Sequence, residues 1–322
     1  MVLYIEKGFL DHFFLSYSEV TASRSEKALF SILKEYGDVT WYIDVTIETP
    51  EDLEELKQEN PFFAFRTNTY PPIPISNFKE HFQKSGHRQT LILSERDKEW
   101  FNEAEHSGAL SLTLENYQEK IERLLEEGTV KIDLFEKFPG WEALNFHNLF
   151  PFNEIVISDG YILKNEEKMG DNIIPLLNVL LKNTSRTKPT IVKIITKEFN
   201  PKNGDNEEKI KEAAKKRYKR LKRTFKEKNV QFQVIRFDKA SLPSEYDLHD
   251  RIICCNFHFI ECGKGFNLMP PKISDSRIIA ENIFDKFSYR TLKNRIKLYD
   301  MYIETLKKAP SNKFTAYPPI MN

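Results

Sequence analysis

Short apolar runs alternate with helical patterns along most of this 322-residue chain. Each run has the length of one strand, and the segments between runs repeat apolar residues at helical spacings of three and four. In the first half, the expected strands are Phe13–Tyr17, Val39–Val45, Phe62–Phe65, Thr90–Leu93, Ala109–Leu112 and Val130–Leu134. The expected helices there are Ser23–Tyr36, Pro50–Gln58, Ile75–Lys84 and Leu114–Glu127. This alternation predicts an α/β fold, in which helices cover the faces of a sheet.

The alternation continues after a connector at residues 138–150. The expected strands are Glu154–Ile157, Thr190–Thr196, Val230–Phe237 and a hairpin of Arg251–Cys255 with Phe257–Cys262. The expected helices are Asp171–Leu181, Asn206–Lys228 and most of Asp275–Asp300. Helices between strands favour a mainly parallel, mixed sheet. We therefore predict two α/β domains, residues 1–137 and 138–309, and a poorly ordered tail at 310–322.

Composition excludes few classes of function. Lys plus Arg and Asp plus Glu each number 48, so net charge indicates no partner. Cys254, Cys255 and Cys262 lack CxxC spacing, which predicts reduced core thiols in a cytoplasmic protein. No His, Cys, Asp or Glu set has metal-ligand spacing, so we expect neither metal nor cofactor. No apolar run reaches 18 residues and no basic segment opens the chain, so neither a membrane span nor a signal peptide is expected.

One predicted helix is intensely basic. Residues 209–228 contain eleven Lys and Arg residues but only two acidic ones, and their apolar residues form a stripe on one side. A docked helix with a basic outer face suits a polyphosphate backbone or an anionic membrane, although charged faces are commonly just solvated. The candidate nucleic-acid-binding residues are Lys215, Lys216, Lys219, Arg220, Lys222, Arg223 and Lys226.

A second polar feature follows at Leu248-His249-Asp250-Arg251, where an apolar run begins. Residues i and i+2 of a strand face the same way, so His249 and Arg251 can point at one target. Gly263-Lys264-Gly265 returns to the same region, followed by Asn267. An imidazole, a guanidinium and a Gly-Lys-Gly turn suit a phosphate group. His249, Arg251, Lys264 and Asn267 are therefore the candidate phosphate-binding residues, against the plainer interpretation of a strand-start ion pair and a hairpin turn.

The order of these motifs resembles the phospholipase D-like domain at the C-terminus of certain MIT-domain proteins. That family has Asp-Pro-Tyr after its first strand, and this chain has Asp159-Gly160-Tyr161. It also has His-Asp-Arg followed by Gly-Arg-Gly-Leu, matched here by His249-Asp250-Arg251 and Gly263-Lys264-Gly265-Phe266. The resemblance covers about residues 146–290 and implies phosphate binding rather than cleavage. From the residues alone, Asp159 is expected to cap a strand end and Tyr161 to be a core aromatic.

The catalytic phospholipase D motif, His-x-Lys, four residues, Asp, six residues, Gly-Ser, fits this region in spacing but not in chemistry. His249 holds the His position and Arg251 the Lys position, while Asn256 replaces the Asp and Gly263-Lys264 replaces Gly-Ser. The family's enzymes use two half-motifs, one His attacking phosphorus and the other serving as general acid. One half-motif per chain would require a homodimer for catalysis, with His249 as the only candidate catalytic residue.

Another resemblance competes at the N-terminus. Phe13-Phe14-Leu15-Ser16-Tyr17-Ser18 is similar to the opening strand of Toll/interleukin-1 receptor domains, and Trp100–Glu103 is faintly similar to their Trp-Cys-x-x-Glu helix. The 43 residues from Ile47 to Gln89 exceed what that fold usually needs there. An unrelated α/β domain is the favoured interpretation of this half.

These patterns together predict a non-catalytic phosphate-binding or nucleic-acid-binding component of a larger prokaryotic system, built as a homodimer. A membrane surface is a less favoured partner than nucleic acid. Two alternatives stay open: a dimeric phosphodiesterase or nuclease that uses His249, and an assembly subunit whose basic helix docks a protein partner of the same system. A place in phage defence rests on the domain type alone.

Overall fold

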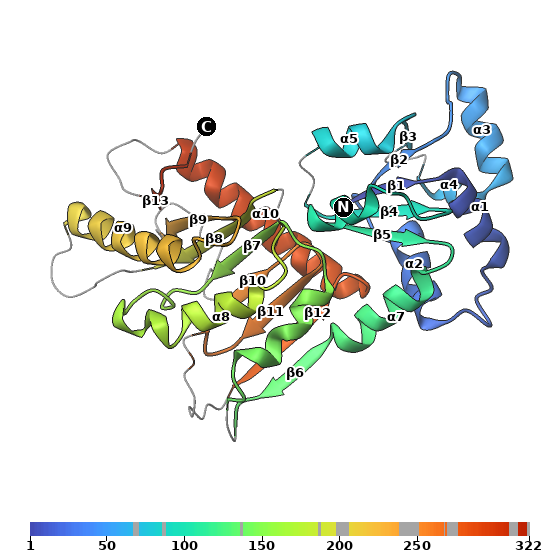
Figure 1. Cartoon of the computed structure of the whole chain (residues 1–322). Coiled ribbons are helices and arrows are strands. Elements are labelled where there is room, and N and C mark those ends of the chain that lie inside the picture. Colours follow the sequence, from blue (N-terminus) through green and yellow to red (C-terminus); the bar gives the residue numbers. More distant parts are fainter. Residues whose placement is uncertain are drawn as a thin grey trace. The chain divides into compact units, whose positions relative to one another are not determined.

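The computed structural model covers the whole chain and describes residues 1–66, 71–85, 88–135, 138–185, 188–197, 206–237, 251–266, 268, 276–308 and 315–320. The fold is mixed α/β, with one parallel and one mixed sheet, which confirms the predicted class (Figure 1). The chain divides into two compact units, one of residues 1–127 and 283–287, the other of residues 128–282 and 288–322. Among the described helices, none has both the length and the apolar character to cross a membrane.

The first unit contains a five-stranded parallel sheet in the order β3-β2-β1-β4-β5. Its strands are β1 (Val2–Ile5), β2 (Thr40–Ile43), β3 (Ile73–Pro74), β4 (Thr90–Ser94) and β5 (Ala109–Thr113). β1, β4 and β5 are buried along their whole length, as expected of parallel strands covered on both faces. The chain moves outward from β1 to β3 and then returns to the other side of β1 with β4. The ends of β1 and β4 therefore form a topological switch point.

Seven helices flank this sheet: α1 (Lys7–Ser16), α2 (Arg24–Lys34), α3 (Pro50–Glu59), α4 (Pro61–Arg66), α5 (Phe78–Lys84), α6 (Phe101–His106) and α7 (Tyr117–Glu127). Capping boxes at Ser23 and Thr49 fix where α2 and α3 begin. Phe82 of α5 and Phe101 of α6 pack with Tyr4 of β1 on one face of the sheet.

Two predicted strands in this unit are wrong. Phe13–Tyr17 lies largely in α1, because Phe9, Leu10 and Phe13 bury one side of a helix. Phe62–Phe65 lies in α4, with Phe62 packed against Phe13. The first strand is instead β1, so the segment similar to the opening strand of Toll/interleukin-1 receptor domains is helical at Phe13–Ser16.

The second unit contains an eight-stranded mixed sheet in the order β13-β9-β8-β7-β10-β11-β12-β6. The strands are β6 (Val130–Asp133), β7 (Glu154–Ser158), β8 (Thr190–Thr196), β9 (Val230–Arg236), β10 (Ile252–Cys254), β11 (His258–Cys262), β12 (Arg277–Asn282) and β13 (Ala316–Tyr317). Only β7, β8 and β9 pair in parallel, and the other described pairs are antiparallel. The sheet is mixed as predicted, but it is mainly antiparallel rather than mainly parallel.

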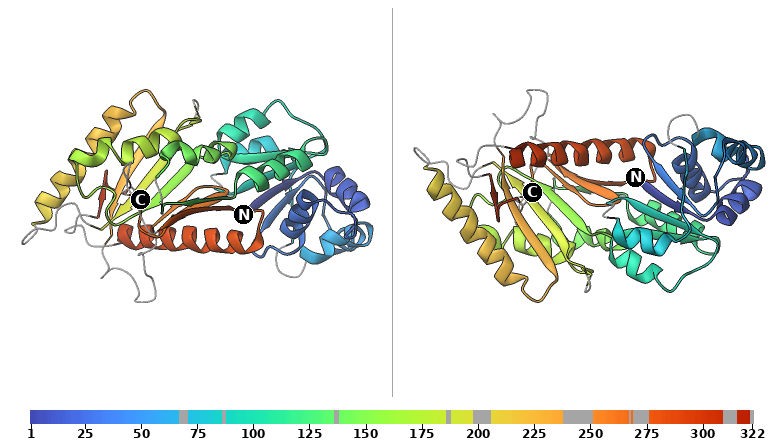
Figure 2. Two further views of the ribbon diagram at one scale, coloured as in Figure 1. Left: turned by 90° about the horizontal axis from the view of Figure 1, so that it is seen from below. Right: turned by 90° about the horizontal axis from the view of Figure 1, so that it is seen from above.

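Helices cover both faces of this second sheet. They are the 3-10 helices η1 (Trp141–Leu149) and η2 (Glu167–Gly170) and the α-helices α8 (Ile173–Leu180), α9 (Glu207–Thr224) and α10 (Lys286–Lys308). Figure 2 shows α10 along one face, with α8 and α9 against the opposite face. A continuous core of strand residues such as Ile155 and Ile194 packs against Leu177 of α8 and Leu221 of α9.

Three further expectations need correction or comment. The predicted helix in Asp275–Asp300 is confirmed from Lys286 onward as part of α10, whereas Arg277–Asn282 forms β12 between β11 and β6. The expected disordered tail contains β13, which pairs with β9. β6 belongs to the second sheet, although the predicted domain boundary places its residues in the first domain.

Candidate functional site

The described residues of the motifs that carry the phospholipase D resemblance meet at one end of the strands in the second sheet. Asp159 directly follows β7, Arg251 directly precedes β10, and Gly263–Phe266 directly follows β11. Ile252 of β10 is opposite Ser158 of β7 and Glu261 of β11. Because β10 runs antiparallel to both neighbours, its first residue lies beside their carboxyl ends. Segments about a hundred residues apart in sequence are thus adjacent in the fold.

Asp159 fastens two of these segments together. It is 2% exposed, and its Oδ2 accepts the main-chain N–H of Phe266 at 2.7 Å. Its Oδ1 accepts the N–H of Tyr161 at 2.8 Å. Burial raises the pKa of the Asp159 carboxyl above its ordinary value of 3.8, although these two N–H groups and Arg251 oppose the shift. The expected capping role of Asp159 is confirmed, whereas Tyr161 is 42% exposed and is not a core aromatic.

Gly265 brings the third motif into contact with the other two. Its φ of +86° lies in the left-handed region that favours glycine. A Cβ added to Gly265 would stand 2.7 Å from both Arg251 Cδ and Asp159 Oδ2. A side chain therefore cannot fit between the turn, the aspartate and the arginine without moving them.

Basic groups surround this junction. Arg251 is half-buried and donates from Nη1 to the carbonyl of Gly263, which holds its guanidinium beside the turn. Lys264 lies exposed in the same turn. Lys197 follows β8, and its side chain packs against Gly160. Of the four predicted phosphate-binding residues, the structure brings Arg251 and Lys264 together, whereas His249 and Asn267 lie outside the described residues.

Asn256 does not belong to this junction. It lies between β10 and β11, at the opposite end of the hairpin from Arg251, and is fully buried. Its amide binds the main-chain N–H and the side chain of Asn153. The residue that replaces the catalytic motif's Asp is therefore part of a turn rather than of the candidate site.

The predicted basic helix is α9, and it begins after an Asn206 cap. Arg217 is 6% exposed and donates to the carbonyls of Leu163, Lys164 and Ala213. Arg220 donates to the carbonyl of Glu166. These arginines hold the loop after Asp159 against the helix.

Most of the remaining predicted cations are exposed. Lys216, Lys219, Lys222 and Arg223 lie exposed on α9, and Lys226 lies exposed in a turn, because the helix ends at Thr224 rather than at the predicted Lys228; Lys215 is half-buried. Lys216 pairs with Glu166, Lys215 with Glu212 and Lys226 with Glu227. The side chains of Lys219, Lys222 and Arg223 form no hydrogen bond or ion pair with any residue that the structure describes. A hollow of about 420 Å³ lies beside Lys219 and is lined by Glu166, Glu212, Ala213, Lys215, Lys216, Arg217 and Lys219.

The exposed cations of α9 and the junction lie toward opposite ends of the strands in the second sheet. Glu207, in the first turn of α9, pairs with Arg236 at the carboxyl end of β9. Beyond the helix, Lys228 donates to the carbonyl of Leu181, and β9 then begins at Val230. The exposed cations therefore extend from the middle of α9 toward the end of the sheet where β9 begins. Tyr161 and Lys164 lie exposed in the loop that joins the two regions.

The first unit has a pocket of about 240 Å³ at its switch point, lined by Glu6, Asp44, Ser76, Asn77, Phe78, Lys79, Ile92, Ser94, Lys98, Trp100 and Phe101. Glu6 pairs with Lys98 and accepts the N–H of Glu95. Asp44 accepts the N–H of Lys7 in the first turn of α1. The carboxylates of Glu6 and Asp44 thus already accept the main-chain N–H groups that a phosphate would bind at a switch point, so this pocket does not favour a phosphate. The sequence patterns gave no sign of this pocket.

Another group missed by the sequence patterns is a buried set of metal-ligating side chains, His147, Cys255 and His258. Their spacing shows no motif because His147 is more than a hundred residues from the other two. The sequence predicts no metal-ligand set, whereas the structure buries all three of these side chains together.

Comparison with known proteins identifies no relative: no family model, no curated protein and no solved structure matches this chain. The phospholipase D resemblance therefore stays a prediction from the sequence motifs.

Proposed function

We propose that the second unit is a degenerate phospholipase D-like domain that binds phosphate groups of a polyanion without cleaving them. Nucleic acid is the favoured polyanion, ahead of an anionic membrane. The observation that carries this proposal is the junction of Asp159, Arg251 and the Gly263–Phe266 turn. These three motifs are separate in sequence, and a shared site explains why they converge.

The chemistry of the junction favours binding over catalysis. Both oxygens of Asp159 accept main-chain N–H groups, so its carboxylate holds the turn in place rather than facing a substrate. Arg251 presents a planar guanidinium, whose donor geometry matches phosphate oxygens. Lys264 adds a second positive charge in the exposed turn. An anion is the ligand that such a surface stabilises best.

The basic face of α9 extends the binding surface to the length of a polymer. Residues 215 to 223 of α9 span about 12 Å along the helix axis. One strand of B-DNA places a phosphate about every 3.4 Å, so this length faces roughly four phosphates. Lys219, Lys222 and Arg223 form no ion pair within the described part of the chain, and their charge is available to an external partner. A free phosphate would need only the junction, whereas a polyanion would also need α9.

Salt-dependent binding of labelled DNA and RNA tests the proposal. Replacing Lys219, Lys222 and Arg223 with Gln should reduce the slope of log affinity against log salt by about 2–3, since each phosphate contact contributes about 0.7–0.9. The matched control replaces Arg290, Lys297 and Lys308 of α10, which are also one arginine and two lysines and are exposed on the opposite face of the sheet.

The control variant should bind like the wild type. Equal losses in both variants, or no nucleic-acid affinity of the wild type at low salt, would overturn the proposal. Cleavage of the labelled strand that His249→Ala abolishes would replace binding with the dimeric phosphodiesterase. Affinity for anionic vesicles alone would move the partner from nucleic acid to membrane.

A further inference from the structure

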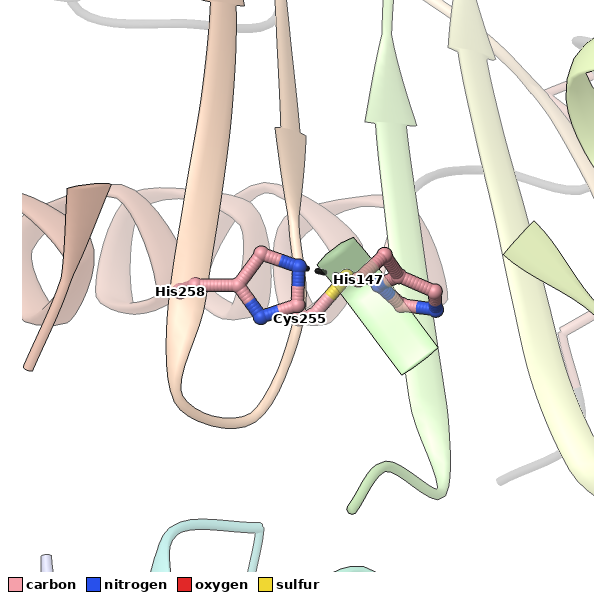
Figure 3. A group of neighbouring side chains, drawn as sticks. All are labelled: His147, Cys255 and His258. Carbon is pink, nitrogen blue, oxygen red and sulfur yellow. Dashed lines mark hydrogen bonds between the residues drawn. The ribbon is translucent and has the colours of Figure 1, made fainter. Parts of the chain in front are cut away.

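A buried set of three metal-ligating side chains lies in the core of the second unit, away from the basic surface. His147 belongs to η1, Cys255 follows β10, and His258 begins β11. Figure 3 shows the three side chains converging on one point. Both histidines are 0% exposed and Cys255 is 1% exposed. Among the residues that the structure describes, no other group of His, Cys, Asp and Glu side chains is close enough to share a metal ion.

The ligand atoms of the three residues face one another. His147 Nδ1 is 2.9 Å from His258 Nε2, and Cys255 Sγ is 3.6 Å from His147 Nδ1. All three ligand atoms lie within 4.8 Å of one another. Metal–nitrogen bonds of about 2.0 Å at trigonal angles place two nitrogens about 3.5 Å apart. Binding therefore requires the histidines to separate by only roughly half an ångström.

The tautomer of His147 already suits a ligand. Its Nε2 lies 2.9 Å from the carbonyl oxygen of Leu180. A carbonyl only accepts hydrogen bonds, so Nε2 carries the proton and Nδ1 carries the lone pair. A histidine whose second nitrogen donates to a main-chain carbonyl is the usual arrangement around protein-bound metals, because it fixes both the tautomer and the ring.

Burial keeps the imidazoles neutral. Both rings lie fully inside the core, where an uncompensated imidazolium charge would be costly. The thiolate is the form of cysteine that binds a metal, so the Cys255 thiol loses its proton on binding. Without a metal, the group is a neutral hydrogen-bonded set in which His258 Nε2 donates its proton to His147 Nδ1. When a metal binds, this proton moves to His258 Nδ1, which has no hydrogen-bond partner among the described residues, and the thiol proton is released.

Charge and coordination number then select the metal. Two neutral imidazoles and one thiolate carry a single negative charge. A monovalent cation makes this buried site neutral, whereas Zn²⁺ leaves a net positive charge in the core, which is costly. Structural zinc also takes four ligands almost without exception. Thiolate favours soft ions and imidazole also suits copper.

We propose that His147 Nδ1, Cys255 Sγ and His258 Nε2 form a closed, three-coordinate site for a soft monovalent metal ion, with Cu⁺ as the best match. The site is closed to solvent, so the metal is acquired during folding and serves to hold the β10–β11 turn against η1. This proposal is independent of polyanion binding, because none of its ligands lies at the junction or on α9.

Metal content after refolding tests the site. The full chain is unfolded in urea, refolded without oxygen in the presence of Cu⁺ or Zn²⁺, dialysed, and analysed for bound metal. The wild type should retain about one Cu⁺ per chain and little zinc, and Cu⁺ should raise its thermal unfolding midpoint. Cys255→Ala should lower retention by at least the ~10–100-fold that loss of an outer-shell partner costs.

Cys254→Ala is the matched control, because Cys254 is the neighbouring buried cysteine and is outside the metal-ligating group. It should retain copper like the wild type. Equal retention by Cys255→Ala and Cys254→Ala would overturn the site, and so would zinc retention without copper. If Cys255→Ala does not refold, the wild type alone decides, since a wild type that refolds with no copper contradicts the proposal.

Discussion

Gly265 offers the sharpest test of the junction at the edge of the second sheet. A non-glycine residue in the left-handed region costs about 1–2 kcal/mol. The new methyl group of Gly265→Ala would also stand 2.7 Å from Asp159 Oδ2 and from Arg251 Cδ, so one of them must move. If Asp159 moves, the buried N–H of Phe266 loses its partner, which costs about 1–3 kcal/mol. We expect Gly265→Ala to lower the free energy of unfolding by about 2–4 kcal/mol.

Gly263→Ala in the same turn is the control for this prediction. A Cβ at Gly263 meets only the Ser276 hydroxyl at 3.0 Å, and that side chain can rotate. Its cost should stay within about 0.5 kcal/mol, as for most surface substitutions. Equilibrium urea unfolding of both full-length variants measures the difference in their free energies of unfolding. Binding of DNA should weaken in Gly265→Ala alone. Equal stability of the two variants would refute the convergence of the three motifs.

Two further substitutions test the contacts around the junction. Asp159→Asn keeps one acceptor for two N–H donors and should cost about 1–3 kcal/mol. Because burial raises the pKa of Asp159 in the folded state above 3.8, the wild type is stabilised by protonation and loses that contribution as pH rises through the raised pKa. Urea midpoints across acidic pH should show this loss in the wild type but not in Asp159→Asn, and parallel pH profiles would contradict it. Arg217→Met removes three donated hydrogen bonds and should lower the free energy of unfolding by about 2–3 kcal/mol. Lys216→Met is the control, because the Lys216 side chain is 71% exposed, and it should cost under about 0.5 kcal/mol. Similar costs for the two variants in urea unfolding would disprove the anchoring role of Arg217.

Local patterns predicted most elements of this fold because their signals were strong. Ser23 and Pro50 mark where α2 and α3 begin, and both helices lie where expected. The expected strand Thr190–Thr196 matches β8 to the residue. The apolar stripe of α9 also predicted a docked helix with its basic residues outward. Arg217 and Arg220 differ, because they donate to main-chain carbonyls of the neighbouring loop.

The errors arose where sequence alone could not decide between interactions. Phe13 lies in an apolar run of strand length, yet Phe9 and Leu10 give the same segment a helical side. Strand direction in the second sheet depends on which strands become neighbours, and β10 lies beside β7 across a hundred residues of chain. The same long-range pairing brings His147 to His258, so no spacing rule could have found the metal-ligating group.

Recognition of phosphate is the central claim, and a backbone comparison tests it most directly. The wild-type chain is titrated with a labelled DNA strand and with a strand of the same bases on an uncharged peptide backbone. We expect affinity for DNA that falls steeply with salt, and no measurable affinity for the uncharged strand, because the junction and α9 offer cations rather than stacking surfaces. Equal affinity for both strands, independent of salt, would contradict the account.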